Sequence, residues 1–326
     1  MATPANPLFA VTNRLPAPAV EALRGAGEVR IDERDEALPR AELLELVAGA
    51  DAVLTLLHDR VDEELLEAAG PQLRCVANVA VGYDNVDVAA AAGRGVVVTN
   101  TPGVLDDATA DLTMALLLAA TRRVAEGDRL IRAGRPWVWG MHFMLGSSLR
   151  GKLLGIVGLG GIGRRVAERA RAFGMEIAYH SRHEAPAEVV AALGAKRLPL
   201  DQLLAEADAV SLHCPLTPET HHLIGAAELE AMKPSAVLIN AARGPVVDER
   251  ALAEALASGQ IAAAGLDVYE HEPQVEPALL ELENVVLSPH LGSATVETRT
   301  AMAELAARNA IAVVCGEEPP TPVSAP

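Results

Sequence analysis

The stretch LLGIVGLGGIGRRVAERARAFG, residues 153–174, decides the fold. It opens as a short apolar run typical of a buried strand, turns on glycines, and continues with apolar residues on one helical face, namely Ile162, Val166, Ala167 and Ala170. Gly158, Gly160 and Gly163 have the GxGxxG spacing, which permits a tight turn and the close approach of a pyrophosphate. The free N–H groups at the helix start, including those of Gly161 and Ile162, would face that anion. The stretch predicts a strand–turn–helix unit that binds a dinucleotide.

The same alternation of buried strands and helical stretches extends in both directions. Before the glycine turn the expected strands lie in residues 51–57, 73–80 and 95–100, and after it in 175–180, 208–214, 236–242, 262–268 and 284–290. Thr101-Pro102-Gly103 interrupts the pattern ahead of a long helical segment that starts near Asp106. We therefore expect an α/β protein with two doubly wound parallel-sheet domains, Rossmann- or flavodoxin-like, and a cleft between them. The Pro-rich tail EEPPTPVSAP is expected to be loose.

Composition and charge exclude several classes of protein. Half of the 326 residues are hydrophobic, which excludes a disordered chain. The 27 Lys and Arg residues against 44 Asp and Glu give a net charge of −17, which argues against a nucleic-acid partner. No apolar run is long enough to cross a membrane, and the N-terminus has no signal-peptide pattern, so a cytoplasmic location is expected. Three widely spaced cysteines suggest neither disulfides nor a zinc site, and no metal is expected.

The residues after the second strand of the nucleotide unit bear on the choice of cofactor. An acidic residue about 20 positions after the glycines normally binds the ribose hydroxyls of NAD. Here Ser181 and Arg182 stand at that place. A hydroxyl and a guanidinium suit the 2′-phosphate of NADP, which a carboxylate would repel. We therefore expect NADP(H) to be preferred, with NAD(H) also possible. The alternative is that Arg182 is a solvated loop residue and that both cofactors are used.

A second group of polar residues follows three later strands. Arg243 stands in NAARGPVVDE, Asp267 and Glu272 stand in GLDVYEHEP, and His290 stands in SPHLGSAT. Parallel strands end at one edge of a sheet, so these side chains can converge. Arg243 would hold the carboxylate of a 2-oxo acid and polarise its ketone, His290 would supply a proton, and Glu272 would orient the imidazole. Taken singly, each has a structural alternative: a surface ion pair, a loop carboxylate, or a capped core histidine.

These motifs carry a resemblance that covers nearly the whole chain. With VANVAVGYDNVDVAAAAGRGVVVTNTPGVLDDATAD, LHCPLTPETHHLI and MKPSAVLINAARGPVVDE in this order, the sequence resembles the D-isomer-specific 2-hydroxyacid dehydrogenases, most closely the glyoxylate/hydroxypyruvate reductases. The resemblance implies that Arg243 binds substrate and that Glu272 pairs with a catalytic His290. It also implies that backbone groups of Val81 and Gly82 contact substrate, and that the dinucleotide is lined by Cys214, Pro215, Ala241, Ala242, Asp267, Gly292 and Ser293.

The same resemblance implies the organisation of the chain. Residues 1–100 and 293–326 would form the substrate domain, and residues 101–292 the Rossmann dinucleotide-binding domain. The segment 106–150 resembles an arm through which family members form homodimers and shape a neighbour's substrate pocket. The sequence departs from the family at Met141, where proline is usual, and at Phe143, where glyoxylate reductases often have tryptophan. The aromatic residues Trp139 and Phe143 are so close together in the sequence that they could instead simply form the core of an interface.

The sequence as a whole predicts an NADP(H)-preferring reductase. It would convert glyoxylate to glycolate and hydroxypyruvate to D-glycerate, with small 2-oxo acids as its substrates. The alternative within the same chemistry is an NAD-dependent D-lactate or phosphoglycerate type dehydrogenase. A formate dehydrogenase is disfavoured, because that branch has Gln where Glu272 stands. An alternative from another class is a nucleotide-sensing corepressor-like binding protein, since such proteins keep the same three residues.

Overall fold

The computed structural model describes residues 6–324, which divide into two compact units. The first unit contains the described residues up to Leu105 and those from Ala294 onward, and the second runs from Asp106 to Ser293. The chain therefore passes from the first unit to the second and back again. Within residues 6–324, no helix has both the length and the apolar character needed to cross a membrane.

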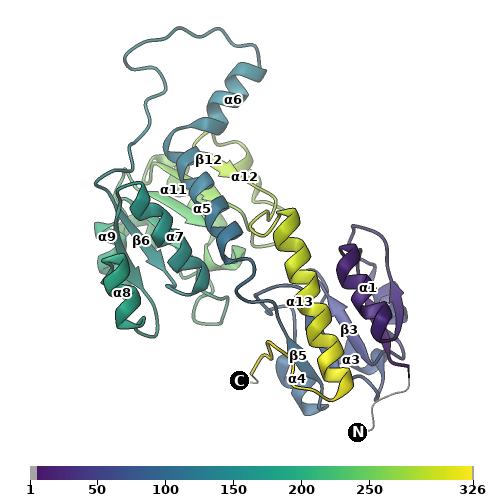
Figure 1. Ribbon diagram of the computed structural model, residues 1–326. Helices are drawn as coiled ribbons and strands as arrows, with labels where there is room; N and C mark the ends of the chain where they lie inside the picture. The colour runs from purple at the N-terminus through teal and green to yellow at the C-terminus, as the bar shows by residue number, and fades with distance from the viewer. Residues whose placement is uncertain (1–5, 325–326) are drawn as a thin grey trace. The chain divides into compact units, whose positions relative to one another are not determined.

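The first unit is a five-stranded parallel sheet with strand order β2-β1-β3-β4-β5 (Figure 1). This is the flavodoxin-like order. Its strands are β1 (Leu8–Val11), β2 (Glu28–Ile31), β3 (Ala52–Thr55), β4 (Cys75–Asn78) and β5 (Val97–Thr99). Its helices are α1 (Ala17–Ala26), α2 (Arg40–Val47), α3 (Glu63–Ala69), α4 (Val88–Gly93) and α13 (Val296–Cys315).

Helices cover both faces of this sheet. Leu43 of α2, Leu65 of α3 and Ala91 of α4 belong to one apolar cluster with the strands. Helices α1 and α13 pack against each other, and α13 also packs on β3 and β4 (Figure 1). The buried residues of α13 include several alanines, whose small side chains let the helix approach its neighbours closely.

Residues 321–323 of the Pro-rich tail are paired with the first sheet, so for them the expectation of a loose tail was wrong; residues 325 and 326 lie outside the described residues. Residues 321–323 run antiparallel to β5, with a bridge between Thr99 and Pro322 and a hydrogen bond from the Val323 N–H to the Val98 carbonyl. Thr321 also donates its hydroxyl to the Asn100 carbonyl. Proline-rich composition gave no sign of this pairing. The edge strand β5 has free backbone N–H and C=O groups, and the non-proline residues Thr321 and Val323 of the tail can form hydrogen bonds with this edge.

The second unit is a seven-stranded parallel sheet with strand order β12-β11-β10-β9-β6-β7-β8. Its strands are β6 (Leu153–Val157), β7 (Glu176–His180), β8 (Lys196–Arg197), β9 (Ala209–Leu212), β10 (Val237–Asn240), β11 (Ala263–Leu266) and β12 (Val285–Leu287). Its helices are α5 (Asp106–Thr121), α6 (Val124–Arg132), α7 (Gly161–Ala172), α8 (Ala187–Leu193), α9 (Leu200–Glu206), α10 (Ala226–Ala231), α11 (Glu249–Ser258) and α12 (Pro277–Leu280), with a 3₁₀ turn at Gly244–Val246.

The strand order of this unit reverses between β6 and β9. From β6 the chain proceeds to β7 and β8 on one side, and from β9 it proceeds to β10, β11 and β12 on the other. Open α/β sheets bind ligands at the carboxyl ends of the strands beside such a reversal. Helices α5 and α7 cover one face, α9 and α11 contribute to the core on the other, and α6 with the loop after it extends away from the sheet (Figure 1).

Candidate active site

The glycine turn between β6 and α7 lies at the reversal point and has the geometry that a pyrophosphate needs. Gly158 has φ +97°, and a methyl group there would lie 2.7 Å from the backbone nitrogen of Cys214. A methyl group on Gly163 would lie 2.2 Å from the Gly158 carbonyl oxygen. At Gly160, in contrast, no atom lies within 4 Å of the position a methyl group would take. The turn is therefore packed against protein at Gly158 and Gly163 and open at Gly160. The first N–H groups of α7, which lack helical partners, lie at this opening, so the turn fits a dinucleotide phosphate.

The other two residues of this turn differ in their surroundings. Gly161 is exposed and faces the carboxylate of Asp106 at the start of α5, where a side chain would collide with Oδ2. Ile162 is half-buried against the apolar cluster beneath α5 and α7. Burial raises the pKa of the Asp106 carboxyl above its ordinary value. The start of α7 is thus held close to the start of α5.

Ser181 and Arg182 lie just past the end of β7, beside the glycine turn. The Ser181 hydroxyl accepts a hydrogen bond from the Leu159 N–H at 2.9 Å. Arg197 of β8 donates to the Ser181 carbonyl at 3.0 Å, which holds the loop against its neighbouring strand. Arg182 is exposed. The Ser181 hydroxyl therefore lies at the turn, and the Arg182 guanidinium is close enough to Cys214 and Glu219 to act on the pKa of each group. Within 176–182 the only acidic side chain, Glu176, is at the far end of β7.

Cys214 and Pro215 follow β9, on the other side of the reversal. Burial raises the pKa of the Cys214 thiol to about 11, so the thiol stays protonated and is a poor nucleophile. Its neighbour His213 donates or accepts a 2.8 Å hydrogen bond between Nε2 and the Ser211 hydroxyl, whereas its Nδ1 is buried without a partner. Burial lowers the pKa of His213 to about 3.

Arg243 is carried on a sharp turn directly after β10. The buried Asn240 makes this turn: its Oδ1 accepts the Ala242 N–H at 3.1 Å and its Nδ2 donates to the Arg243 carbonyl at 2.9 Å. Ala241 is buried beneath the turn. The guanidinium of Arg243 donates to the Ala242 carbonyl at 2.8 Å and is close enough to Glu272 to help lower the pKa of that carboxyl.

His290 and Glu272 form a pair. Nδ1 of His290 is 2.8 Å from Oε2 of Glu272, and Oε1 of Glu272 accepts the Tyr269 N–H at 3.0 Å. Burial alone would raise the pKa of Glu272, but the contacts with His290, the Tyr269 N–H and Arg243 outweigh it and lower this pKa. An ionised Glu272 accepts a hydrogen bond from the Nδ1–H of His290, which leaves Nε2 as the ring nitrogen available to a substrate.

Asp267 holds the loop that presents His290. Its carboxylate accepts hydrogen bonds from the Leu291 N–H at 2.7 Å, the Gly292 N–H at 2.8 Å and the Ser288 hydroxyl at 2.5 Å. His290 has φ +51°, in the left-handed region that residues other than glycine seldom adopt. The contacts of Asp267 stabilise this backbone. Gly292 and Ser293 follow in the same loop, so the structure brings the C-terminal half of the predicted site together at one edge of the sheet.

Val81 and Gly82 belong to the first unit. Asn100 donates its amide to the Val81 carbonyl at 2.8 Å, and Asn78 donates to the Gly82 carbonyl at 2.9 Å. Both carbonyls are therefore engaged. This loop follows β4, at the carboxyl edge of the five-stranded sheet.

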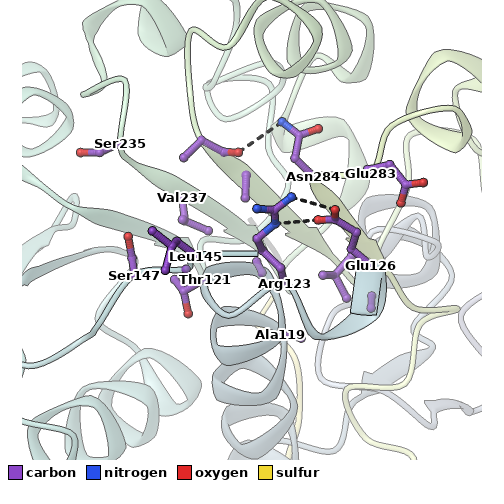
Figure 2. Close-up of a pocket in the computed structure, with 16 residues that line it drawn as sticks. Ala119, Thr121, Arg123, Glu126, Leu145, Ser147, Ser235, Val237, Glu283 and Asn284 are labelled. Atoms are coloured by element: carbon purple, nitrogen blue, oxygen red, sulfur yellow. Dashed lines mark hydrogen bonds and ion pairs between the residues drawn. The ribbon is translucent and has the colours of Figure 1, made fainter. Parts of the chain in front are cut away.

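A cavity of about 420 Å³ lies elsewhere in the second unit (Figure 2). Figure 2 shows Arg123 paired with Glu126. The Asn284 amide donates to the Ala262 carbonyl at 3.2 Å. Val237 and Ala263, at the beginnings of β10 and β11, line it. It is thus at the amino edge of the sheet, opposite the glycine turn and His290, and it is not the candidate active site.

Sequence reasoning missed the residues that support the site. Asn240, Ser288 and Tyr269 bind no predicted ligand, but they fix the turns that carry Arg243, His290 and Glu272. A signal was available for one of them, since Asn240 is a polar residue in an otherwise apolar strand directly before the arginine turn.

Comparison with known proteins identifies chains that are similar over nearly the whole length. The family model of the D-isomer specific 2-hydroxyacid dehydrogenase NAD-binding domain matches residues 114–292. A glyoxylate reductase of Thermococcus litoralis is 50% identical over 324 residues, covering 98% of this chain and 97% of that protein. The crystal structure of an NADPH-dependent glyoxylate/hydroxypyruvate reductase of Sinorhizobium meliloti, in complex with NADP and malonate, is 40% identical with a TM-score of 0.85, covering 98% and 97%. A glyoxylate reductase structure from Paecilomyes thermophila is 37% identical with a TM-score of 0.88, covering 98% and 99%.

Proposed function

Because the chain belongs to the D-isomer-specific 2-hydroxyacid dehydrogenase family, we propose that it reduces small 2-oxo acids, converting glyoxylate to glycolate and hydroxypyruvate to D-glycerate. The observation that carries this proposal is the Glu272–His290 pair, with Arg243 close to the same carboxylate. Reduction of a ketone needs a proton donor for the oxygen and a cation for the substrate carboxylate, and this group of residues supplies both.

In this mechanism each residue has one task. Arg243 binds the substrate carboxylate and polarises the ketone, and the backbone of Val81 and Gly82 provides further substrate contacts. Glu272 keeps the imidazole oriented and stabilises its protonated form, and Nε2 of His290 gives its proton to the ketone oxygen. The nicotinamide cofactor supplies the hydride. The glycine turn from Gly158 to Gly163 would hold its pyrophosphate, and the strand-end residues Cys214, Pro215, Ala241, Ala242, Asp267, Gly292 and Ser293 would line it.

We propose NADP(H) as the preferred cofactor, with NAD(H) accepted. Ser181 and Arg182 support this choice, because a hydroxyl and an exposed guanidinium occupy the place where an acidic residue would repel a 2′-phosphate. The similar reductase of Sinorhizobium meliloti was crystallised with NADP. A cytoplasmic location stays a prediction.

The test is the oxidation of NADPH and NADH at 340 nm by purified protein with glyoxylate, hydroxypyruvate, pyruvate and phosphohydroxypyruvate. We expect the highest kcat/KM with glyoxylate or hydroxypyruvate and NADPH. Turnover restricted to NADH and pyruvate or phosphohydroxypyruvate would instead identify a D-lactate or phosphoglycerate type dehydrogenase. Binding of the nucleotide without any turnover would favour the corepressor-like alternative.

The larger organisation is also a proposal. We assign substrate binding to residues 1–100 and 293–326 and nucleotide binding to residues 101–292. These ranges differ by a few residues from the two compact units, which divide after Leu105 and after Ser293. We further propose a homodimer formed through α6 and the loop that follows it. No residue of α6 is buried, and the loop exposes the apolar side chains of Trp137, Val138, Trp139 and Met141.

A further inference from the structure

One buried carboxylate close to the candidate active site has no part in the mechanism above. Glu249, the first residue of α11, is only 4% exposed. Its Oε1 accepts the Glu270 N–H at 2.6 Å and its Oε2 accepts the Glu276 N–H at 3.2 Å. A single side chain therefore binds the backbone at both ends of the loop 270–276.

The contact between α11 and this loop is reciprocal. Oε2 of Glu270 accepts the Glu249 N–H at 3.1 Å, one of the donors that a helix start leaves without a helical partner. Oε1 of Glu270 is 2.6 Å from Nε2 of His222. A methyl group on Gly244 would lie 1.8 Å from the Tyr269 carbonyl carbon, so the chain just after Arg243 is also in backbone contact with the start of the loop.

Glu272 stands at the tip of the loop that Glu249 closes. An antiparallel β-bridge pairs His271 with Gln274, the residues on either side of Glu272 and Pro273. Of its two oxygens, one accepts the Tyr269 N–H and the other contacts His290. Because Glu272 is itself partly exposed, its position depends on the backbone of this short loop more than on packing of its side chain.

The Glu249 carboxylate is buried, so the hydrogen bonds from the Glu270 and Glu276 N–H groups replace most of its contacts with water. Burial, with the nearby carboxylates of Glu270 and Glu276, raises the pKa of the Glu249 carboxyl. Burying a carboxylate is costly unless hydrogen bonds compensate, so the two N–H contacts stabilise the side chain and the loop together. An acidic residue that served only the dipole of α11 would need neither burial nor the contact with residue 276.

We propose that Glu249 is a positioning residue for the Glu272–His290 pair: by binding both ends of the loop 270–276 it fixes Glu272 within hydrogen-bond distance of His290. The inference rests on the proposed roles of Glu272 and His290. It adds a residue that contacts neither substrate nor cofactor but controls the geometry of the proton donor, for which a misplacement of about 1 Å costs up to about 100-fold in rate.

The kinetic test compares Glu249→Ala and Glu249→Gln with Glu254→Gln, an exposed acidic residue on the same helix. We expect Glu249→Ala to lower kcat between about 10- and 100-fold with the KM for NADPH unchanged. Glu249→Gln keeps one acceptor and should fall between Ala and wild type. Glu254→Gln should match wild type. A folded Glu249→Ala variant with the kcat of wild type would overturn the proposal.

The second test needs no substrate, so it separates this inference from the proposed function. The titration of the Glu272 carboxyl is followed by ¹³C NMR and assigned by its absence in Glu272→Gln. Since contact with His290 holds the pKa of Glu272 below its ordinary value, Glu249→Ala or Glu249→Gln should raise it, and Glu254→Gln should not. Reduced stability with an unchanged Glu272 titration would show a merely structural role and overturn the proposal. Failure of wild type to reduce glyoxylate would count against the proposed function alone.

Discussion

At the scale of the residue, the candidate site consists of side chains that depend on polar neighbours. Asn240 shapes the turn that carries Arg243, Asp267 holds the left-handed backbone of His290, and Glu272 is set by the Tyr269 N–H. Each supporting group is buried or hydrogen-bonded. The proposed reaction therefore needs correct backbone geometry in three separate turns, and substitutions at the three candidate residues should have different kinetic signatures.

His290→Ala and Arg243→Ala should separate proton donation from substrate binding. Without His290 the ketone oxygen has no donor, so kcat should fall by about 10² to 10⁴-fold while NADPH binding, measured by fluorescence, is kept. Without Arg243 the substrate carboxylate loses a charged partner, so KM for glyoxylate should rise and kcat/KM should fall by about 100-fold. Near-normal turnover in both variants would contradict the proposed roles.

His213 should make the stability of the protein depend on pH. Burial lowers its pKa from 6.5 to about 3, so the unfolded chain takes up a proton below pH 6.5 that the folded chain refuses. The neutral His213 therefore contributes fully to the free energy of unfolding above pH 6.5. This contribution is lost as the pH falls toward 3, at up to about 1.4 kcal/mol per pH unit. Urea unfolding should show that the free energy of unfolding falls less between pH 6.5 and pH 5 in His213→Gln than in wild type. The exposed His183→Gln serves as control and should lose as much as wild type.

At the scale of the element, most of the second unit could be predicted from the sequence because its strands are apolar runs bounded by turn residues. The helix after the glycine turn was predicted to have Ile162, Val166, Ala167 and Ala170 on one apolar face; the last three are fully buried, and Ile162 is half-buried against the same apolar cluster. The two-residue strand β8, Lys196–Arg197, has no apolar pattern and was not expected. The tail at 321–323 was misjudged for a related reason: its order comes from pairing with β5, a long-range contact that local composition does not encode.

The candidate site divides in the same way. Arg243, Glu272 and His290 could be selected as candidates, since their motifs follow strands and resemble those of a known family, and their roles stay predictions. Glu249 could not be recognised, because an acidic residue at the start of a helix is common for reasons of the helix dipole. Its role appears only when the loop 270–276 is folded against α11.

The glycine turn allows a substitution that should weaken cofactor binding without changing the stability of the protein. Gly160 has φ −82°, and an added methyl group meets no atom of the described chain within 4 Å, so Gly160→Ala should fold with an unchanged Tm. The methyl group would occupy the space proposed for the pyrophosphate, and NADPH should bind about tenfold more weakly or worse, equivalent to about 1.4 kcal/mol. Gly25→Ala, which also meets nothing within 4 Å, is the matched control. Unchanged affinity in Gly160→Ala would place the phosphate elsewhere.

At the scale of the whole molecule, the second unit presents an apolar surface that a monomer would leave in water. Trp137 stacks on Phe143 with ring centroids 6.2 Å apart in the loop after α6, and Val138 and Trp139 beside them are 81% and 76% exposed. Leu145, at the end of the same segment, lines the cavity of Figure 2 at the amino edge of the sheet. Contiguous apolar side chains of this kind mark protein–protein contact, and in the proposed homodimer a second copy of the chain would supply the same surface by two-fold symmetry.

Substitution of one valine tests whether this surface forms the homodimer. Light scattering after size-exclusion chromatography should give wild type twice the 34.0 kDa chain mass. Val138→Glu would bury a carboxylate in the apolar contact, which is unfavourable, so the variant should elute with the mass of one chain. Val296→Glu is the matched control, because Val296 is also 81% exposed but lies on α13 in the first unit, and it should stay dimeric. A dimeric Val138→Glu, or a monomeric wild type, would exclude the loop after α6 as the interface.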